Sequence, residues 1–182
     1  MTMKFFVFVD GSFANNEDLT SQIGFIIVLG NETRYQEEGK ASIWGNIIHW
    51  SSTKCKRVTR STLASEIYGM VSGFDYGYVL KETVRAIARR LDFPQPPLVL
   101  CTDSYSLYEC LVKMGTTIEK RLMIDIMGLR ESYEGKEIDE VRWIQGDGNP
   151  ADAMTKASPN RALEALVERN SVDIQIDGWV ER

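Results

Sequence analysis

Histidine is almost absent from this chain, which has one, His49, among 182 residues. A nucleophilic site of the Ser-His-Asp or Cys-His type could use only that residue, so the sequence argues against such chemistry. The three cysteines form neither a CxxC pair nor a Cys/His spacing. Their odd number and their spacing argue against a disulfide framework and against structural zinc. Any chemistry in this chain is therefore expected to use other groups.

Long apolar runs are missing too. The longest near the start, Phe5 to Val9, has five residues, whereas a spanning helix needs roughly 20. A secretory signal peptide needs a cationic start and a longer apolar run. No repeat and no Pro/Gly/Ser-rich linker divides the chain. We expect residues 1–182 to form a single domain of a soluble, intracellular protein without a membrane partner.

The chain has fewer basic than acidic residues. It contains 21 lysines and arginines and 26 aspartates and glutamates, which gives a net charge of −5. At first sight this argues against a nucleic-acid partner. An enzyme that holds metal ions, however, uses some of its carboxylates as ligands. If four acids form one site, the remaining surface is nearly neutral, and a nucleic-acid partner stays possible.

The spacing of apolar residues predicts the element order βββ-α-β-α-α-β-α. An antiparallel meander followed by βα units makes a mixed sheet with helices on its faces, which is an α/β architecture. Gly30-Asn31 is interpreted as a turn. The expected strands cover residues 4–9, 23–29, 33–43, 98–101 and 141–144, and a further short strand at 47–50 follows the third. The expected helices cover 61–91, 104–114, 120–134 and a segment that Pro150 opens.

Four acids fall at the boundaries of these elements. Asp10 and Asp103 follow two central strands, and the carboxyl ends of neighbouring strands form the crevice where open α/β sheets bind ligands. Glu66 flanks the apolar stripe of the long helix, and Asp152 opens the last helical segment. We expect all four carboxylates to converge on one rim.

Converging carboxylates repel one another and stay ionised only if cations neutralise them. Oxygen ligands suit Mg²⁺ or Mn²⁺, and two such ions about 3.5–4 Å apart can clamp the attacking and leaving oxygens of a phosphoryl transfer. That chemistry needs neither histidine nor thiol.

Each acid also has an ordinary interpretation. Asp10-Gly11 is a common turn, and Glu66 could be a solvated helix flank. Asp103 could cap the helix that follows it, and Asp152 could simply lie in a first helical turn. The ordered placement of the four, rather than any one of them, indicates a site.

Two pairs of motifs resemble a known family. Phe8–Ser12 and Cys101–Ser104 are similar to the first and third acidic motifs of ribonuclease H domains. His49–Ser52, followed by Ser61–Glu66, resembles the copia-type retrotransposon version, in which a Trp-Ser-Ser segment precedes the acidic helix.

The end of the chain carries the most specific match. Ile144–Lys156 resembles that family's Ala-Asp-x-x-Thr-Lys closing motif, and Glu119–Ile126 fits its preceding helix in the style of fungal elements. The resemblance runs from about residue 5 to about residue 160.

The resemblance implies a ribonuclease H-like fold with a five-stranded mixed sheet, the first three strands antiparallel. It implies an endonuclease that uses two Mg²⁺ ions, with Mn²⁺ as a substitute, to hydrolyse the RNA strand of an RNA–DNA hybrid. The implied partner is the polymerase domain of a reverse transcriptase in the same polyprotein, in the cytoplasm or within virus-like particles. The implied catalytic residues and metal ligands are Asp10, Glu66, Asp103 and Asp152.

The chain departs from the family at two places where relatives have histidine. Cellular and retroviral relatives have a histidine before the last acid, and this chain has none there; Met123 stands where copia relatives often have histidine.

Alternatives stay open for the fourth ligand and for the function. Asp147 is a rival to Asp152 as fourth ligand. A catalytically silent module beside a polymerase and an integrase-like nuclease of the same superfamily remain alternatives.

Substrate contacts are expected from two sets of residues. A cationic cluster before the Glu66 helix could bind phosphates, although a solvated loop explains it equally well. Polar residues next to the acids could contact the hybrid through its shape and its 2′-hydroxyls. The cations are Lys54, Lys56, Arg57 and Arg60, and the polar residues are Ser12, Asn15 and Ser104.

Overall fold

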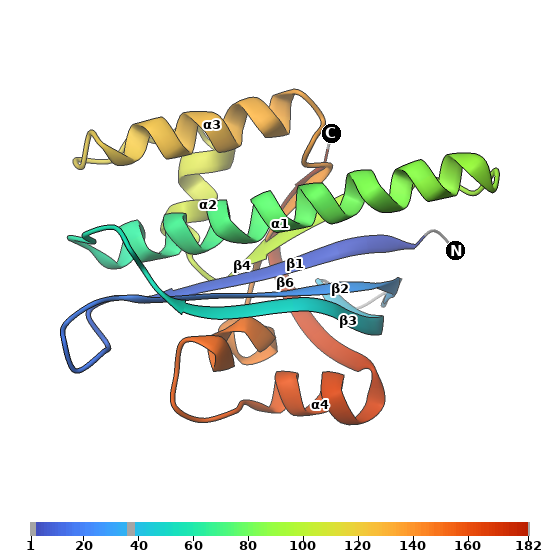
Figure 1. The fold of residues 1–182 in the computed structure, drawn as a ribbon, viewed down its shortest axis with the longest axis horizontal. Helices are drawn as coiled ribbons and strands as arrows, with labels where there is room; N and C mark the ends of the chain where they lie inside the picture. The colour runs from blue at the N-terminus through green and yellow to red at the C-terminus, as the bar shows by residue number, and fades with distance from the viewer. Residues whose placement is uncertain (1–2, 36–38, 182) are drawn as a thin grey trace.

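The computed structural model describes residues 3–35 and 39–181, which form one sheet with helices on both faces (Figure 1). The strands are β1 (Lys4–Ser12), β2 (Gln22–Arg34), β3 (Lys40–Lys54), β4 (Leu98–Thr102), β5 (Glu140–Ile144) and β6 (Ser171–Glu181). The helices are α1 (Thr62–Arg90), α2 (Tyr105–Val112), α3 (Leu122–Glu134) and α4 (Arg161–Arg169), and two 3₁₀ turns are η1 (Gly146–Gly148) and η2 (Pro150–Met154).

The sheet is mixed, and its six strands close on themselves in the order β1-β2-β3-β6-β5-β4. β1, β2 and β3 are antiparallel neighbours, whereas β4 lies parallel to β1 and β5 parallel to β4. The predicted α/β fold with three antiparallel strands first is thereby confirmed. The predicted count of five strands is wrong, because β6 pairs antiparallel with both β3 and β5.

The predicted turn at Gly30-Asn31 is also wrong, since both residues lie inside β2. Gly30 faces Gly45 across β2 and β3, and a Cβ on Gly30 would collide with the backbone there. This glycine therefore permits a close approach of two strands and does not form a turn.

The predicted strands 33–43 and 47–50 differ from the structure, because β3 is one long strand rather than two pieces. Part of the expected strand 33–43 falls on residues 36–38, outside the described residues.

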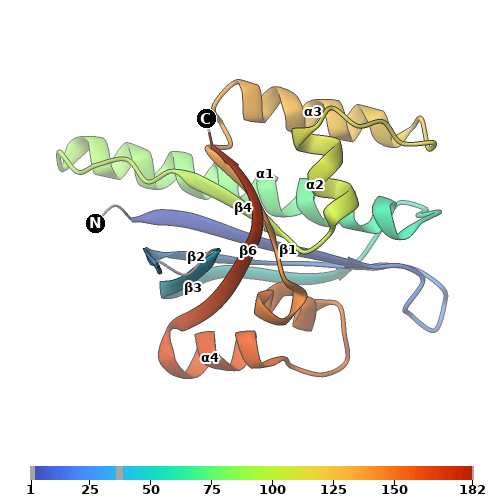
Figure 2. The same ribbon diagram turned by 180° about the vertical axis from the view of Figure 1, so that it is seen from behind.

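Alternation along β1 divides its side chains between two hydrophobic cores. Val7 and Val9 face α1, α2 and α3, whereas Phe6 and Phe8 face α4 and β6 on the other side of the sheet (Figure 2). Because both faces are covered, every residue from Phe5 to Val9 is fully buried.

Among the described residues, no helix combines the length and the apolar character that crossing a membrane requires.

A stripe of glycines on α1 faces β1. A Cβ on Gly69 would lie 2.7 Å from the carbonyl oxygen of Asp10, and a Cβ on Gly73 would lie 2.7 Å from Cγ1 of Val9. The helix therefore packs with its backbone close to the strand. α1 begins after Ser61, whose hydroxyl accepts a hydrogen bond of 3.1 Å from the backbone N–H of Ala64. This placement brings the first turns of α1 beside the end of β1.

A buried ion-pair network fills the inner face of the closed sheet near the start of β1. The guanidinium of Arg142 is fully buried and donates to both Glu32 oxygens, at 2.8 and 3.0 Å, and to both Glu140 oxygens, at 2.6 and 2.8 Å. Lys4 adds an ion pair of 2.6 Å to Glu32. Side chains on β1 alternate between its two faces. The face that points away from α1 carries Lys4, Phe6, Phe8 and Asp10. This face therefore extends from the ion-pair network at Lys4 to the predicted site acid Asp10.

Candidate active site

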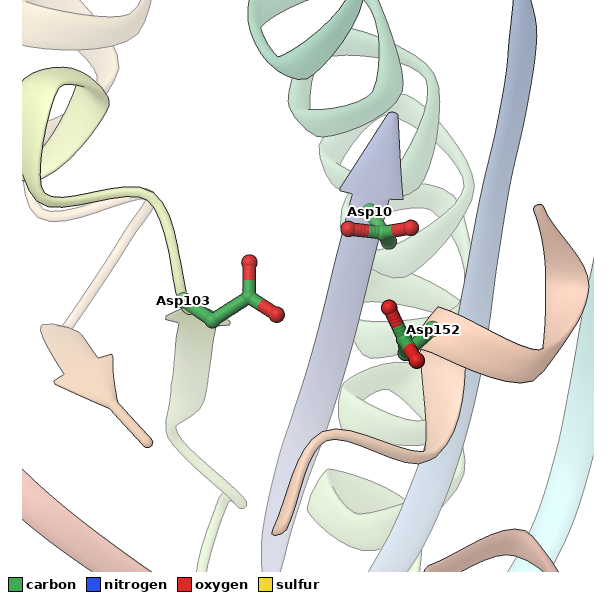
Figure 3. A group of neighbouring side chains, drawn as sticks. All are labelled: Asp10, Asp103 and Asp152. Carbon is green, nitrogen blue, oxygen red and sulfur yellow. The ribbon is translucent and has the colours of Figure 1, made fainter. Parts of the chain in front are cut away.

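Three carboxylates meet at the end of β1. Asp10 lies on β1, Asp103 directly follows β4, and Asp152 lies on η2; each offers an oxygen within 4.8 Å of the other two. Figure 3 shows the three side chains turned toward one another from these separate elements. Asp10 is buried, and the other two are half-buried. Such a group of oxygen donors is suited to a hard divalent cation.

Glu66 lies beside this group but outside its 4.8 Å limit. Its side chain is buried and accepts a hydrogen bond from the backbone N–H of Gly11. Its Oε2 is buried and has no hydrogen-bond partner among the residues that the structure describes. A buried carboxylate oxygen with no donor is costly unless something positive faces it. The residues present therefore fit a bound cation.

The pKa values of these acids are raised. Burial raises the pKa of Asp10 to about 7; the hydrogen bond from the Thr155 hydroxyl opposes the shift, and the Asp103 and Asp152 carboxylates add to it. Burial, then repulsion from Asp10 and Asp103, raises the pKa of Glu66 to about 9. Burial likewise raises the pKa of Asp103. A cation among these groups would favour their ionised forms and displace the protons.

Polar side chains hold the acids in place. Asn149 is fully buried and donates from Nδ2 to the carbonyl oxygen of Val9 at 3.0 Å and to Asp103 at 3.3 Å. Thr155 donates its hydroxyl hydrogen to Asp10. Sequence reasoning did not predict that Asn149 and Thr155 contact site acids; the only local signal was an asparagine before Pro150, which indicates a cap. Its Oδ1 does accept from the N–H of Ala151 at 3.1 Å.

A cleft of about 720 Å³ opens beside the acids. Asp147 lies on its wall, exposed, and is not one of the three converging carboxylates. The structure thus brings Asp152, rather than Asp147, to Asp10 and Asp103. The described residues lining the cleft are Asp103, Gly146, Asp147, Asp152, Lys156, Pro159, Asn160, Arg161 and Glu164.

No protein-family model and no curated protein sequence matches this chain. Solved structures do: ribonuclease H1 of the halophilic archaeon Halobacterium salinarum aligns over 88% of this chain and 98% of its own, with a TM-score of 0.56 and 17% identity. LC11-RNase H1, solved in complex with an RNA/DNA hybrid, aligns over 88% and 99%, with a TM-score of 0.57 and 14% identity. The N-terminal RNase H domain of a Mycobacterium tuberculosis protein aligns over 92% and 98%, with a TM-score of 0.50 and 16% identity. The fold is that of ribonuclease H.

In this ribonuclease H fold, the polar residues predicted to contact substrate lie near the acids. Ser12 ends β1 two residues after Asp10, and Ser104 follows Asp103. The side chain of Asn15 donates to the carbonyl oxygen of Thr155 at 3.2 Å, which ties the β1–β2 loop to the closing motif. The Ser104 hydroxyl accepts from the N–H of Leu107 at 3.3 Å and caps α2.

The predicted cations lie at the same end of the ribonuclease H sheet. Lys54 ends β3, in register with Gln22 and, through it, with Ser12. It forms an ion pair of 2.8 Å with Asp18. Arg57 forms one of 3.1 Å with Asp125 and lies 5.0 Å from the ring of Tyr68. The side chains of the other two, Lys56 and Arg60, are exposed.

The single histidine packs among aromatic side chains. His49 lies on β3 and stacks on Tyr76 with ring centroids 5.0 Å apart, beside Phe25 at 5.7 Å. The imidazole is therefore part of an aromatic group between the sheet and α1.

Proposed function

We propose that this protein is a metal-dependent endonuclease that hydrolyses the RNA strand of RNA–DNA hybrids. The observation that carries the proposal is the group of three carboxylates within 4.8 Å, with the unpartnered Oε2 of Glu66 beside it, in a ribonuclease H fold. LC11-RNase H1, which shares this fold, was solved with an RNA/DNA hybrid. Asp10, Glu66, Asp103 and Asp152 are the proposed catalytic residues and metal ligands.

Oxygen donors alone suit Mg²⁺, with Mn²⁺ as a substitute. Two such ions, when bound, would stabilise the attacking and leaving oxygens of the phosphodiester. The chain's own part is to hold the ligands at fixed positions. Asn149 orients Asp103, and Thr155 orients Asp10, through the hydrogen bonds that they donate.

Substrate binding is proposed for the residues around the acids. Exposed Lys56 and Arg60 would contact phosphates of the hybrid, with Lys54 and Arg57 beside them. These contacts position the duplex without reading its sequence. Ser12, Asn15 and Ser104 would contact the RNA strand, where 2′-hydroxyls distinguish RNA from DNA.

The biological setting proposed is reverse transcription of a copia-type retrotransposon. The Trp-Ser-Ser segment at Trp50–Ser52 and the closing motif at Ala151–Lys156 support it. The partner would be the polymerase domain of the same polyprotein, working in the cytoplasm within virus-like particles.

Cleavage of three end-labelled substrates tests the proposal. We expect RNA-strand cleavage in the hybrid with Mg²⁺ or Mn²⁺, none of duplex RNA or duplex DNA, and none in excess chelator. Cleavage of duplex DNA would instead indicate an integrase-like nuclease. No cleavage of any substrate, by protein that binds Mn²⁺, would indicate a catalytically silent module.

A further inference from the structure

Among the described residues, Lys156 is a cation in contact with the acid group. Its ammonium forms an ion pair with Asp152, four residues earlier in the chain. It also lies near enough to Asp10 and Asp103 that its charge opposes the rise of their pKa values. One ammonium therefore contacts Asp152 and acts electrostatically on the other two converging carboxylates.

The position of Lys156 allows it to move. Its side chain is 58% exposed, whereas that of Asp152 is 20% exposed. Lys156 lines the 720 Å³ cleft, where Asp147, Arg161 and Glu164 are the other charged residues outside the acid group. A flexible four-carbon stem can carry the ammonium from the carboxylates into this open space.

A tethered cation and a divalent ion would bind the same oxygens. Without metal, the ammonium partly neutralises carboxylates that would otherwise repel one another. With metal, like charges at such short range repel each other, so the ammonium has to leave Asp152.

We propose that Lys156 is a built-in counterion that competes with divalent metal for Asp152 and so weakens metal binding. This inference rests on the proposed function, because it takes the acid group to be a metal site. In this role, Lys156 sets how tightly the acid group binds the divalent ion. A lysine that merely oriented Asp152 would have the opposite effect, because its removal would loosen a ligand and weaken metal binding.

The test is Mn²⁺ binding to the full chain without nucleic acid, measured by the electron paramagnetic resonance of the free ion. Lys156→Met should bind Mn²⁺ roughly two- to fivefold more tightly than the parent, the range set by losing one partly exposed ion pair. Without metal it should melt at a lower temperature, and Mn²⁺ should raise its melting temperature by more than it raises that of the parent.

Two controls separate charge from shape. Lys156→Arg keeps the charge and should bind Mn²⁺ within about twofold of the parent. Lys113→Met removes an ion pair of the same i,i+4 spacing, to Glu109 at 2.9 Å, away from the acids, and should not change Mn²⁺ binding.

Equal or weaker Mn²⁺ binding by Lys156→Met, with the parent binding normally, would overturn this inference and leave the proposed nuclease intact. If the parent itself binds no Mn²⁺, the metal site fails, and both proposals fail with it.

Discussion

Asp152 and Asp147 lie in different surroundings although they are only five positions apart in the sequence. Asp152 lies on η2 within 4.8 Å of two other carboxylates, and Asp147 is exposed on η1 between two glycines. The acids at element ends were predictable, because strand ends and helix starts can be located from apolar spacing. The role of Asn149 was not, because its contact with Asp103 depends on how β1, β4 and η2 pack.

Substitution of these two acids should separate their roles. Asp152→Asn should lower single-turnover cleavage of the hybrid by at least ~100-fold, because a metal-positioning group is lost. Asp147→Asn should lower the rate of the same cleavage by less than about tenfold, which corresponds to roughly 1.4 kcal/mol of transition-state stabilisation. The reverse order of rates would transfer the ligand role to Asp147.

The long helix α1 connects packing with the site. Its glycine stripe at Gly69, Gly73 and Gly77 lets it lie close to β1, which sets the position of Glu66 one turn earlier. The extent of α1 was predicted well from its apolar spacing. The reason for the glycines was not predictable, because it lies in the strand they face. η2, expected as a helix after Pro150, is a single 3₁₀ segment.

Gly69→Ala should destabilise the protein by about 1–3 kcal/mol, because the added methyl would meet the backbone of Asp10. It should also reduce cleavage by displacing Glu66. Gly128→Ala is the matched control in α3, where a Cβ meets nothing within 4 Å, and it should stabilise by up to ~1 kcal/mol. Urea denaturation measures both; equal effects of the two substitutions would contradict close packing at Gly69.

At the scale of the whole molecule, β6 closes the sheet. Val172, Ile174 and Ile176 are buried and alternate with polar residues, so this strand had a period-2 signal in the sequence. It was missed because the family resemblance ends near residue 160. Its partners could not be predicted, since β3 lies about 130 residues earlier and nothing local specifies such a pairing.

The ion-pair network inside the closed sheet should make stability depend on pH. Burial alone would raise the pKa of Glu32, but hydrogen bonds and charge from Arg142 and Lys4 lower it to about 2, from a usual value of 4.5. Glu32 therefore contributes roughly 3 kcal/mol to the free energy of unfolding above pH 4.5. This contribution is lost as the pH falls toward 2.

Glu32→Gln should remove that contribution. In chelator, its unfolding free energy should fall below that of the parent at pH 7, and the gap should shrink steadily between pH 5 and pH 2.5. Urea titrations across this range measure the gap. A gap that does not change with pH would show that Glu32 acts through packing alone.

The decisive measurement is RNA-strand cleavage as a function of Mg²⁺ concentration, with parent and Asp10→Asn proteins compared on one labelled RNA–DNA hybrid. The parent should cleave the RNA strand internally, with a rate that rises with Mg²⁺ and vanishes in excess chelator. Asp10→Asn, which removes the buried carboxylate of the group, should be at least ~100-fold slower at every Mg²⁺ concentration. Undiminished cleavage in chelator, or by Asp10→Asn, would contradict a metal-dependent ribonuclease built on these carboxylates.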